Sequence, residues 1–264
     1  MSASGMHMPI ALLTDFGSRD WFAGELKGAL LRFSPQARIV DLTHSVEPGD
    51  IRGGALALLS SFRSFPPGTL FLCSVSYGNI SQKAVAVTAG GYFFLSPDNG
   101  LLSWALGKVG DVWLREIDKE KFLLNSGCAT FPARDLLSPL GAKIHDGLEF
   151  SESGPLLDSY ARLPWPETEF SENRAAGEII YIDGFGNAVT SVSPRELAGK
   201  KFSQARLKGN RMIPLGSHYG EVMTGMPLVY PGSGGLMEIG VNGGSAAGKL
   251  GLEVGEGVEF EFKD

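Results

Sequence analysis

The sequence predicts two domains, an N-terminal α/β domain with a mainly parallel sheet and a C-terminal all-β barrel domain. In the first half, short apolar segments alternate with segments of helical spacing, which is typical of α/β sheets. After residue 176, short alternating segments are separated by glycines and helical patterns are almost absent, which is typical of a small barrel. Between them, Pro155, Pro164 and Pro166 lie among acidic residues with little periodicity, which indicates a linker. The expected boundaries are therefore 8–150, 151–176 and 177–264.

Each element has a pattern that predicts it. The apolar run at 9–14 indicates a buried strand, and apolar residues recur at helical spacing over 20–33, with Asp20 as a candidate N-cap. In the first domain we expect further strands over 38–42, 69–75, 84–88, 92–95 and 112–117, and further helices over 50–62, around 102–106 and over 135–144. In the second domain strands are expected over 178–182, 188–192, 228–230, 236–241 and 258–262.

Composition and charge exclude several classes of protein. The 264 residues have a net charge of −6 and a pI near 5.3, which argues against a broad nucleic-acid surface. The one basic stretch, from Lys200 to Arg211, is interpreted as the solvated face of a β-rich segment. No apolar run approaches the length of about 18 residues that spans a bilayer, so we expect no membrane span.

The cysteines and the N-terminus indicate a compartment. The two cysteines, Cys73 and Cys128, are far apart in apolar contexts, which excludes a disulfide scaffold and suits free thiols in a reducing environment. Residues 1–9 lack the basic and apolar regions of a signal peptide. We therefore expect a cytoplasmic protein.

Polar clusters follow the expected strands, where open α/β sheets bind their ligands. The clusters are Thr14-Asp15, Thr43-His44-Ser45, Ser76 to Asn79 and Asp98-Asn99. Each also has the composition of an ordinary turn. Asp15 is the strongest candidate for a binding role, because a carboxylate directly after a buried strand needs partners, and a ribose diol would supply two hydrogen-bond donors. For His44, a hydrogen bond to the backbone and a catalytic role both stay open.

Common catalytic motifs are missing. No cysteine pair or His-x-x-x-His spacing supports a metal site, and we expect neither a metal nor a cofactor. The glycine-rich stretch 232–235 lacks the Lys-Ser/Thr of a phosphate-binding P-loop. Neither a dinucleotide-binding glycine motif nor a G-x-S-x-G nucleophile elbow is present.

Seven motifs, taken in order, carry a family resemblance. They are Thr14-Asp15-Phe16-Gly17 with Asp20; Asp41-Leu42-Thr43-His44 with Pro48 and Asp50; Phe65-Pro66-Pro67-Gly68-Thr69; Pro97-Asp98-Asn99-Gly100-Leu101-Leu102; Thr130-Phe131 with Arg134-Asp135; Asp183-Gly184-Phe185-Gly186-Asn187; and Leu236-Met237-Glu238-Ile239 with Val241-Asn242-Gly243-Gly244-Ser245-Ala246-Ala247. From residue 10 to residue 262 the chain resembles the S-adenosylmethionine (SAM) hydrolases, also called SAM hydroxide adenosyltransferases, to which the SAM-dependent fluorinase and chlorinase are similar. The resemblance implies a homotrimer that binds SAM between the N-terminal domain of one subunit and the C-terminal domain of the next.

The resemblance also implies roles for individual residues. Asp15 would hold the two ribose hydroxyls, and Asp183 would meet the methionine ammonium. Asn187 and the backbone near Asn242 would bind the adenine edge, with Tyr219 against the base as a looser match. The remaining binding candidate is Ser233, which would approach the methionine carboxylate.

The chain departs from the family where the nucleophile is handled. The hydrolases orient the attacking water with an Asp, an Arg and a His. At the three matching positions this chain has Ser76, Gln82 and Pro132. Ala133 stands where the fluorinase has its halide-binding serine. The candidate catalytic residues are therefore uncharged: Ser76, Tyr77, Asn79 and Ser81.

Three functions follow from these matches and departures. The first is a SAM hydrolase that cleaves SAM at C5′ to adenosine and methionine, slowly or with an altered nucleophile site, with water held by Ser76, Asn79 or Ser81. The second is a halide-type adenosyltransferase with a pocket walled by Tyr77, Pro132 and Ala133. The third is a trimer that binds SAM or adenosine without turnover. The geometry behind C5′ decides among them.

Overall fold

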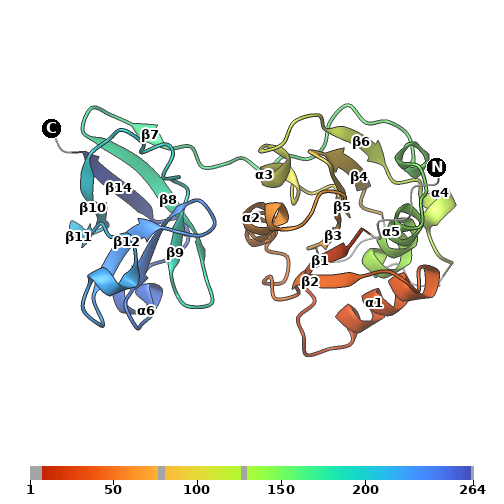
Figure 1. Cartoon of the computed structure of the whole chain (residues 1–264), viewed down its shortest axis with the longest axis horizontal. Helices are drawn as coiled ribbons and strands as arrows, with labels where there is room; N and C mark the ends of the chain where they lie inside the picture. The colour runs from red at the N-terminus through yellow and green to blue at the C-terminus, as the bar shows by residue number, and fades with distance from the viewer. Residues whose placement is uncertain (1–7, 77–80, 126–129, 263–264) are drawn as a thin grey trace. The chain divides into compact units, whose positions relative to one another are not determined.

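The computed structural model describes residues 8–76, 81–125 and 130–262. Contacts divide the chain into two compact units, with the division between Pro164 and Trp165 (Figure 1). Each unit has its own sheet and its own hydrophobic core.

The first unit is built on a six-stranded sheet in the order β2-β1-β3-β5-β4-β6. Its strands are β1 (Ile10–Thr14), β2 (Ile39–Thr43), β3 (Leu70–Ser74), β4 (Ala84–Ala89), β5 (Tyr92–Pro97) and β6 (Trp113–Glu116). The neighbours β2, β1, β3 and β5 are parallel, whereas β4 runs antiparallel to both β5 and β6. The predicted α/β domain with a mainly parallel sheet is confirmed.

Helices cover both faces of this sheet. The helices are α1 (Phe22–Phe33) and α5 (Ser138–His145) on one face, and α2 (Ile51–Ser61) and α3 (Ser103–Leu106) on the other (Figure 1). The wholly buried strand β1 feeds both layers, because Ile10 and Leu12 pack into one core and Ala11 and Leu13 into the other. Burial on both faces explains why β1 and β3 are continuous apolar runs.

A side-chain cap sets where α2 begins, whereas α1 begins without one. Asp50 accepts the backbone N–H of Gly53 at 2.9 Å and caps α2. The predicted cap at Asp20 is wrong, because α1 begins at Phe22 after Trp21 and has no side-chain cap. Four short segments were not expected as separate elements: α4 (Lys119–Phe122), η1 (Phe62–Ser64), the π-helical turn η2 (Ala133–Leu137) and η3 (Phe150–Ser153).

Residues 153–163 of the expected linker run along the first unit. The backbone N–H of Leu157 donates to Leu114 at 3.0 Å, and that of Ala161 donates to the Asp98 carboxylate at 2.7 Å. The contacts that divide the chain thus place this stretch in the first unit. The domain boundaries at 150 and 177 stay predictions.

The second unit is a nearly closed antiparallel sheet in the order β11-β10-β14-β8-β9-β13-β12, with β7 paired to β8. Its elements are β7 (Glu169–Phe170), β8 (Arg174–Ile182), β9 (Ala188–Thr190), β10 (Phe202–Leu207), β11 (Arg211–Pro214), η4 (Tyr219–Glu221), β12 (Pro227–Pro231), β13 (Met237–Val241), α6 (Ala246–Leu250) and β14 (Gly257–Phe262). A bridge from Leu215 to Val229 joins the two ends of the order, so the predicted all-β barrel is confirmed. The short helix α6 was not predicted.

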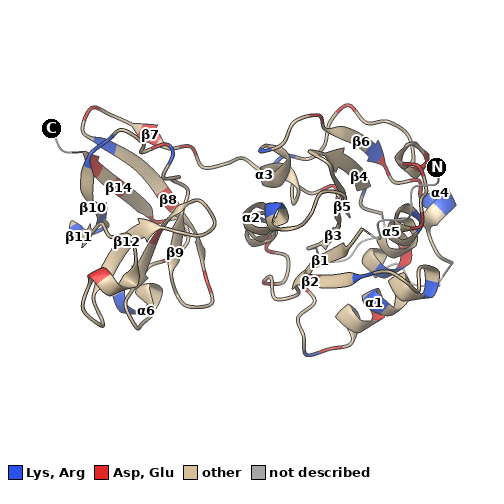
Figure 2. Ribbon diagram, in the orientation of Figure 1, with Lys and Arg blue, Asp and Glu red and all other residues tan. Residues whose placement is uncertain are grey.

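Basic and acidic residues both occur on the ribbon of the second unit (Figure 2). In the basic stretch of β10 and β11, Arg206 pairs with Glu261, and on neighbouring strands Arg174 pairs with Glu259 at 2.7 Å. This pairing agrees with a solvated β surface rather than a phosphate site. None of the helices in the described ranges is long and apolar enough to cross a bilayer.

Candidate active site

The strand order reverses at β1, which has β2 on one side and β3 on the other. Loops that leave neighbouring parallel strands in opposite directions open a crevice at their carboxyl ends, where α/β sheets bind ligands. Asp15 follows β1 and Ser76 lies just beyond β3, so the sheet brings these two predicted site residues together.

Asp15 is held by backbone N–H groups from two loops. Its Oδ2 atom accepts the N–H of Gly49 at 2.9 Å and that of Ser76 at 3.2 Å. Burial raises the pKa of the Asp15 carboxyl above its ordinary value, although the backbone N–H groups of Gly49, Asp15 and Ser76 lower it. The carboxylate is therefore half-buried and only partly compensated, which suits a group that receives further donors from a ligand.

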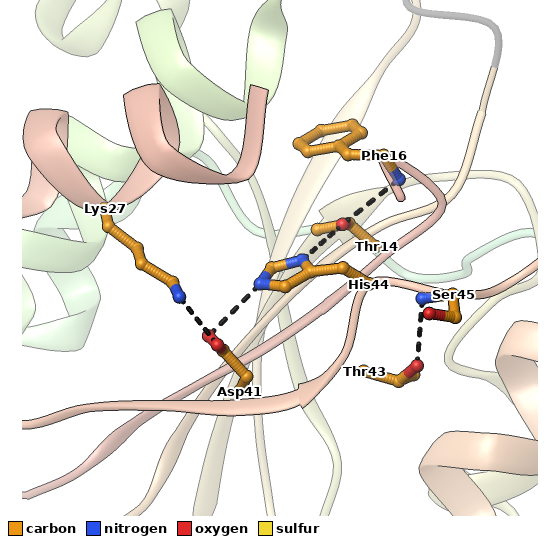
Figure 3. Close-up of polar contacts among 7 residues, drawn as sticks. All are labelled: Thr14, Phe16, Lys27, Asp41, Thr43, His44 and Ser45. Atoms are coloured by element: carbon orange, nitrogen blue, oxygen red, sulfur yellow. Dashed lines mark hydrogen bonds and ion pairs between the residues drawn. The ribbon is translucent and has the colours of Figure 1, made fainter. Parts of the chain in front are cut away.

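His44 lies in a chain of polar contacts that reaches Thr14, the residue before Asp15 (Figure 3). Its Nδ1 atom is 2.7 Å from Thr14 Oγ1, and its Nε2 atom is 3.1 Å from Asp41 Oδ1. Lys27 Nζ lies 2.6 Å from the other Asp41 oxygen. Burial works against the charge on Asp41, but Lys27 and His44 hold the pKa of this carboxyl below its usual range. Both ring nitrogens of His44 thus contact side chains, whereas one of the two alternatives for this residue was a hydrogen bond to the backbone.

The cluster after β5 supports other loops. Asn99 donates to the backbone carbonyl of Val75 at 2.9 Å and accepts the N–H of Leu101 at 3.2 Å. Asp98 accepts the N–H of Ala161. Asp98 and Asn99 therefore make the backbone hydrogen bonds that are typical of turn residues. Asn99 also fixes the end of β3 next to Ser76.

The nucleophile side of the site is only partly described. Tyr77 and Asn79 lie outside the described residues, and Ser81 is exposed. The backbone carbonyl of Gln82 accepts Lys119 Nζ at 3.0 Å, and Lys83 lies 3.5 Å from Glu116. Lys83, which follows Gln82 in the sequence, is therefore paired with a carboxylate.

Aromatic contacts bring the segment with Pro132 and Ala133 near Asp15. The ring of Phe131, directly before Pro132, packs edge-on against that of Phe16 with centroids 5.3 Å apart. After them, Arg134 binds the buried Asp135 with two hydrogen bonds of 2.7 and 2.8 Å. Ala133 is buried at the start of a π-helical turn, a feature that often occurs at functional sites.

The second unit has a pocket of about 660 Å³ that gathers three of the predicted binding residues. It is lined by Phe185, Asn187, Tyr219, Val241, Asn242, Gly243, Gly244 and Ser245. Aromatic rings and side-chain amides are the groups that bind a flat heterocycle, by stacking and by edge hydrogen bonds.

Asp183 organises one wall of this pocket. Its Oδ1 atom accepts the backbone N–H groups of Phe185 at 2.9 Å and Asn187 at 2.8 Å, and its Oδ2 atom accepts the Asn187 amide at 2.9 Å. Asn187 is thereby fixed with its amide nitrogen toward Asp183. A Cβ atom at Gly240 would lie 2.9 Å from the Asn187 oxygen and 2.8 Å from the Tyr219 ring, so only glycine leaves both side chains in place.

Tyr219, Tyr230 and Glu238 form a hydrogen-bonded series that was not foreseen as part of the site. The two tyrosine hydroxyls are 2.6 Å apart, and Tyr230 donates to Glu238 at 2.8 Å. Burial, together with the negative charge of Asp183, raises the pKa of the Glu238 carboxyl, although the Tyr230 hydroxyl lowers it. Glu238 stands within a quoted motif, but its pairing with Tyr230 comes from the β12–β13 register.

The remaining predicted residue, Ser233, is exposed in the loop between β12 and β13. The preceding Gly232 leaves room for the Glu238 carboxylate, which a Cβ atom there would meet at 2.0 Å. Asp15 and Ser76 belong to the first unit, whereas Asp183, Asn187, Tyr219, Ser233 and Asn242 belong to the second. Over residues 8–76, 81–125 and 130–262, no three His, Cys, Asp or Glu side chains are arranged to hold a metal ion.

Comparison with protein families identifies the chain's relatives. The model of the SAM hydroxide adenosyltransferase N-terminal domain matches residues 10–154, and that of the C-terminal domain matches residues 177–259. The chain belongs to this family. Among curated members and relatives, it is 34% identical to the (R)-S-adenosyl-L-methionine hydrolase of Thermus thermophilus, over 94% of this chain and 97% of that one. A hydrolase of the same name from Salinispora tropica is 33% identical, over 94% and 95%.

More distant relatives and solved structures extend the comparison. A fluorinase from an Actinoplanes species is 26% identical, over 93% of this chain and 95% of the fluorinase. The crystal structure of an uncharacterized conserved protein from Thermotoga maritima matches with a TM-score of 0.88 and 31% identity, over 95% of this chain and 99% of that one. A conserved hypothetical protein from Thermus thermophilus matches with a TM-score of 0.77 and 30% identity, over 96% and 99%.

The raised pKa of Glu238 predicts a pH-dependent stability. A carboxyl whose pKa is higher in the folded state than in the unfolded state destabilises the fold at pH values above both, and the penalty disappears below both. Glu238→Gln keeps an acceptor for Tyr230 and removes the charge. We expect it to raise the melting temperature by about 1–4 °C at pH 8, and by less as the pH falls toward 4.

Thermal unfolding of both proteins from pH 4 to pH 8 checks this expectation. Glu253→Gln, at an exposed glutamate of the same unit, is the matched control and should change stability little at any pH. A Glu238→Gln effect that does not depend on pH would contradict the assignment of the penalty to ionised Glu238.

Proposed function

We propose that this member of the family cleaves SAM at C5′ to adenosine and methionine, with water as the nucleophile and at a slow rate. Support comes from the relatives named (R)-S-adenosyl-L-methionine hydrolase, which match this chain more closely than the fluorinases do. The observation that carries the proposal is the half-buried Asp15 carboxylate at the switch point of the sheet.

Asp15 suits the ribose of SAM. Both loop N–H groups bind Oδ2, and outside its own backbone no described residue donates a hydrogen bond to Oδ1. Two vicinal hydroxyls present two donors to one carboxylate, and hydrogen bonds to an ionised acceptor are the stronger kind. We therefore assign Asp15 to the ribose diol.

The second unit suits the two ends of SAM. We assign the adenine to the pocket with Asn187, Tyr219 and Asn242, whose amides and ring match an aromatic heterocycle. The methionine ammonium is assigned to Asp183, an anion already oriented by three N–H donors. Ser233, in its exposed loop, is assigned to the methionine carboxylate.

The displacement needs little chemical assistance. Methionine leaves from a sulfonium as a neutral thioether, so neither a general acid nor a metal nor a cofactor is required for the leaving group. The protein's tasks are to align a nucleophile behind C5′ and to exclude competing water, which are effects of position and desolvation. We assign the water to Ser76, Asn79 or Ser81, with Tyr77 as the fourth candidate catalytic residue. Because none of them is charged, we expect turnover to be slow.

We further propose a homotrimer in which each site is shared between the first unit of one subunit and the second unit of another. The family resemblance suggests this assembly. Trp21 and Phe22 support it, because they are 68% and 40% exposed and their rings contact each other, and contiguous exposed apolar side chains often mark an interface. Cys73, a buried free thiol, supports a reducing cytoplasm as the place of action.

The assembly is expected to show in solution. Light scattering coupled to size exclusion at micromolar concentration should give a mass about three times that of the 28.1 kDa chain. Adenosine should stabilise the trimer against dissociation, because a ligand shared by two subunits favours the assembled state by mass action. A monomeric mass with and without adenosine would contradict the shared site.

The role of Asp15 is tested by binding. Asp15→Ala should weaken adenosine binding roughly 10- to 100-fold, the loss expected for hydrogen bonds to a charged group. The wild-type dissociation constant should rise as the pH falls toward the raised pKa of Asp15, because the protonated carboxyl accepts fewer hydrogen bonds. Calorimetry from pH 5 to pH 8 measures both effects.

Two variants serve as controls for Asp15. Asp15→Asn keeps the shape of the side chain and should bind weakly with no such pH dependence. Glu120→Gln, at an exposed acid on α4, should bind as the wild type does. Unchanged adenosine affinity in Asp15→Ala would refute the assignment.

The missing water-handling residues predict a gain of function. Restoring the family's residues in Ser76→Asp, Gln82→Arg and Pro132→His together should raise the rate of SAM cleavage about 10²- to 10⁴-fold. Each single change should do little, because groups that act as a unit are not additive. Chromatography of adenosine and methionine measures the rate.

The design of this test separates folding from chemistry. Proline fixes its own backbone angle, so the loop must also be shown to accept histidine, by an unchanged melting temperature and adenosine affinity. A wild-type rate equal to that of the triple variant would show that other residues handle the nucleophile. Formation of 5′-chloro-5′-deoxyadenosine in place of adenosine when chloride is added would show that water is not the nucleophile.

A further inference from the structure

His44 joins the loop after β2 to both sides of Asp15. Its side chain contacts Thr14 Oγ1 at 2.7 Å, and its backbone carbonyl accepts the N–H of Gly17 at 2.6 Å. Five residues further along the same loop, Gly49 donates to the Asp15 carboxylate itself. The short segment that carries Asp15 is therefore fixed before, at and after this residue by a single neighbouring loop.

Figure 3 shows the contacts of the His44 ring, and in the neutral ring these hydrogen bonds have one consistent direction. Ionised Asp41 can only accept, so His44 Nε2 carries the proton that bonds to it. In the neutral ring Nδ1 is then an acceptor, and the Thr14 hydroxyl donates to it. Thr14 Oγ1 in turn accepts the backbone N–H of Phe16 at 3.3 Å.

Burial changes steeply along this chain of contacts. Lys27 and Asp41 have 35% and 44% of their side chains exposed, whereas His44 has 9% and Thr14 is wholly buried. An ion pair so exposed contributes little to stability by itself. What the pair does supply is a fixed acceptor that selects one tautomer of the ring beneath it.

We infer that His44 is a positioning residue for Asp15, acting through Thr14 and oriented by Asp41 and Lys27. The inference rests on the proposed function, in which Asp15 binds the ribose. The imidazole holds the backbone of Thr14 to Gly17 in the arrangement that presents the Asp15 carboxylate to Gly49, Ser76 and the ligand. As a positioning residue, His44 would act on ligand binding through the segment that carries Asp15.

A pair of substitutions at Thr14 tests the link to Asp15. Thr14→Val keeps the shape of this buried side chain and removes the hydroxyl, whereas Thr14→Ser keeps the hydroxyl. We expect Thr14→Val to weaken adenosine binding and to raise KM for SAM roughly 3- to 10-fold, with kcat changed less than KM. Thr14→Ser should restore both to near the wild-type values.

A second pair, at His44, tests the geometry of the ring. The amide of asparagine takes the place of Nδ1, and that of glutamine takes the place of Nε2. His44→Asn therefore retains an acceptor for Thr14, whereas His44→Gln retains only the contact with Asp41. The inference expects His44→Asn to bind adenosine more tightly than His44→Gln, and equal affinities or the reverse order would overturn it.

Amide hydrogen exchange in the ligand-free protein separates this inference from the proposed function. Thr14→Val should speed exchange at Gly49 and Ser76, the two N–H groups bonded to Asp15, and Thr14→Ser should not. Unchanged exchange at both amides in Thr14→Val would overturn the inference, whatever the protein binds. A wild-type protein that binds neither adenosine nor SAM would refute the proposed function, while the exchange data would still decide the role of His44.

Discussion

A carboxylate at the end of a buried strand must replace the hydration it has lost, and the first unit is arranged around that need at Asp15. Burial raises the pKa of this carboxyl, and the backbone N–H groups of Gly49 and Ser76 offset part of the cost. These donors come from the loops after β2 and β3, so one side chain fixes three loops at the reversal of strand order. The remaining deficit is what a ligand with hydroxyl donors would satisfy.

In the second unit, Asp183 and Glu238 differ in how well their negative charges are compensated. Asp183 receives three N–H donors and orients Asn187 as a result. Glu238 receives a single hydroxyl from Tyr230 and stays poorly compensated, because burial and the charge of Asp183 both raise its pKa. The electrostatic potential around Asp183 and Glu238 is therefore negative, and a cationic ligand would stabilise these two carboxylates. SAM has two cationic centres, the ammonium and the sulfonium, so this electrostatic arrangement is consistent with the proposed substrate.

The fold class, and the position of Asp15 at the end of a strand, could be predicted from the sequence for identifiable physical reasons. Continuous apolar runs such as β1 and β3 are distinctive because both of their faces are buried, and an Asp placed directly after such a run is conspicuous. Contacts that depend on tertiary structure have no comparable pattern in the sequence. Tyr230 meets Glu238 through strand register, and the expected N-cap at Asp20 gave way to a helix that starts beside the aromatic cluster of Phe16, Trp21 and Phe22. The roles of Asp183 and Asn187 came from the family resemblance, because spacing alone predicts only a turn.

The proposed site also explains how a member of this family could lose the charged residues that orient the nucleophile and keep the residues that bind SAM. In the proposed site, the ribose, the base and the ammonium are assigned to Asp15, Asn187 and Asp183, each fixed by hydrogen bonds to backbone or amide groups. Attack by the nucleophile depends on the residues that orient one small molecule behind C5′. Because the sulfonium leaves as a neutral group, binding that places C5′ correctly already supplies much of the catalysis, through proximity and desolvation. On the proposed function, exchange of an Asp, an Arg and a His for Ser76, Gln82 and Pro132 would remove the activation of water, while the residues assigned to SAM would still present it for displacement.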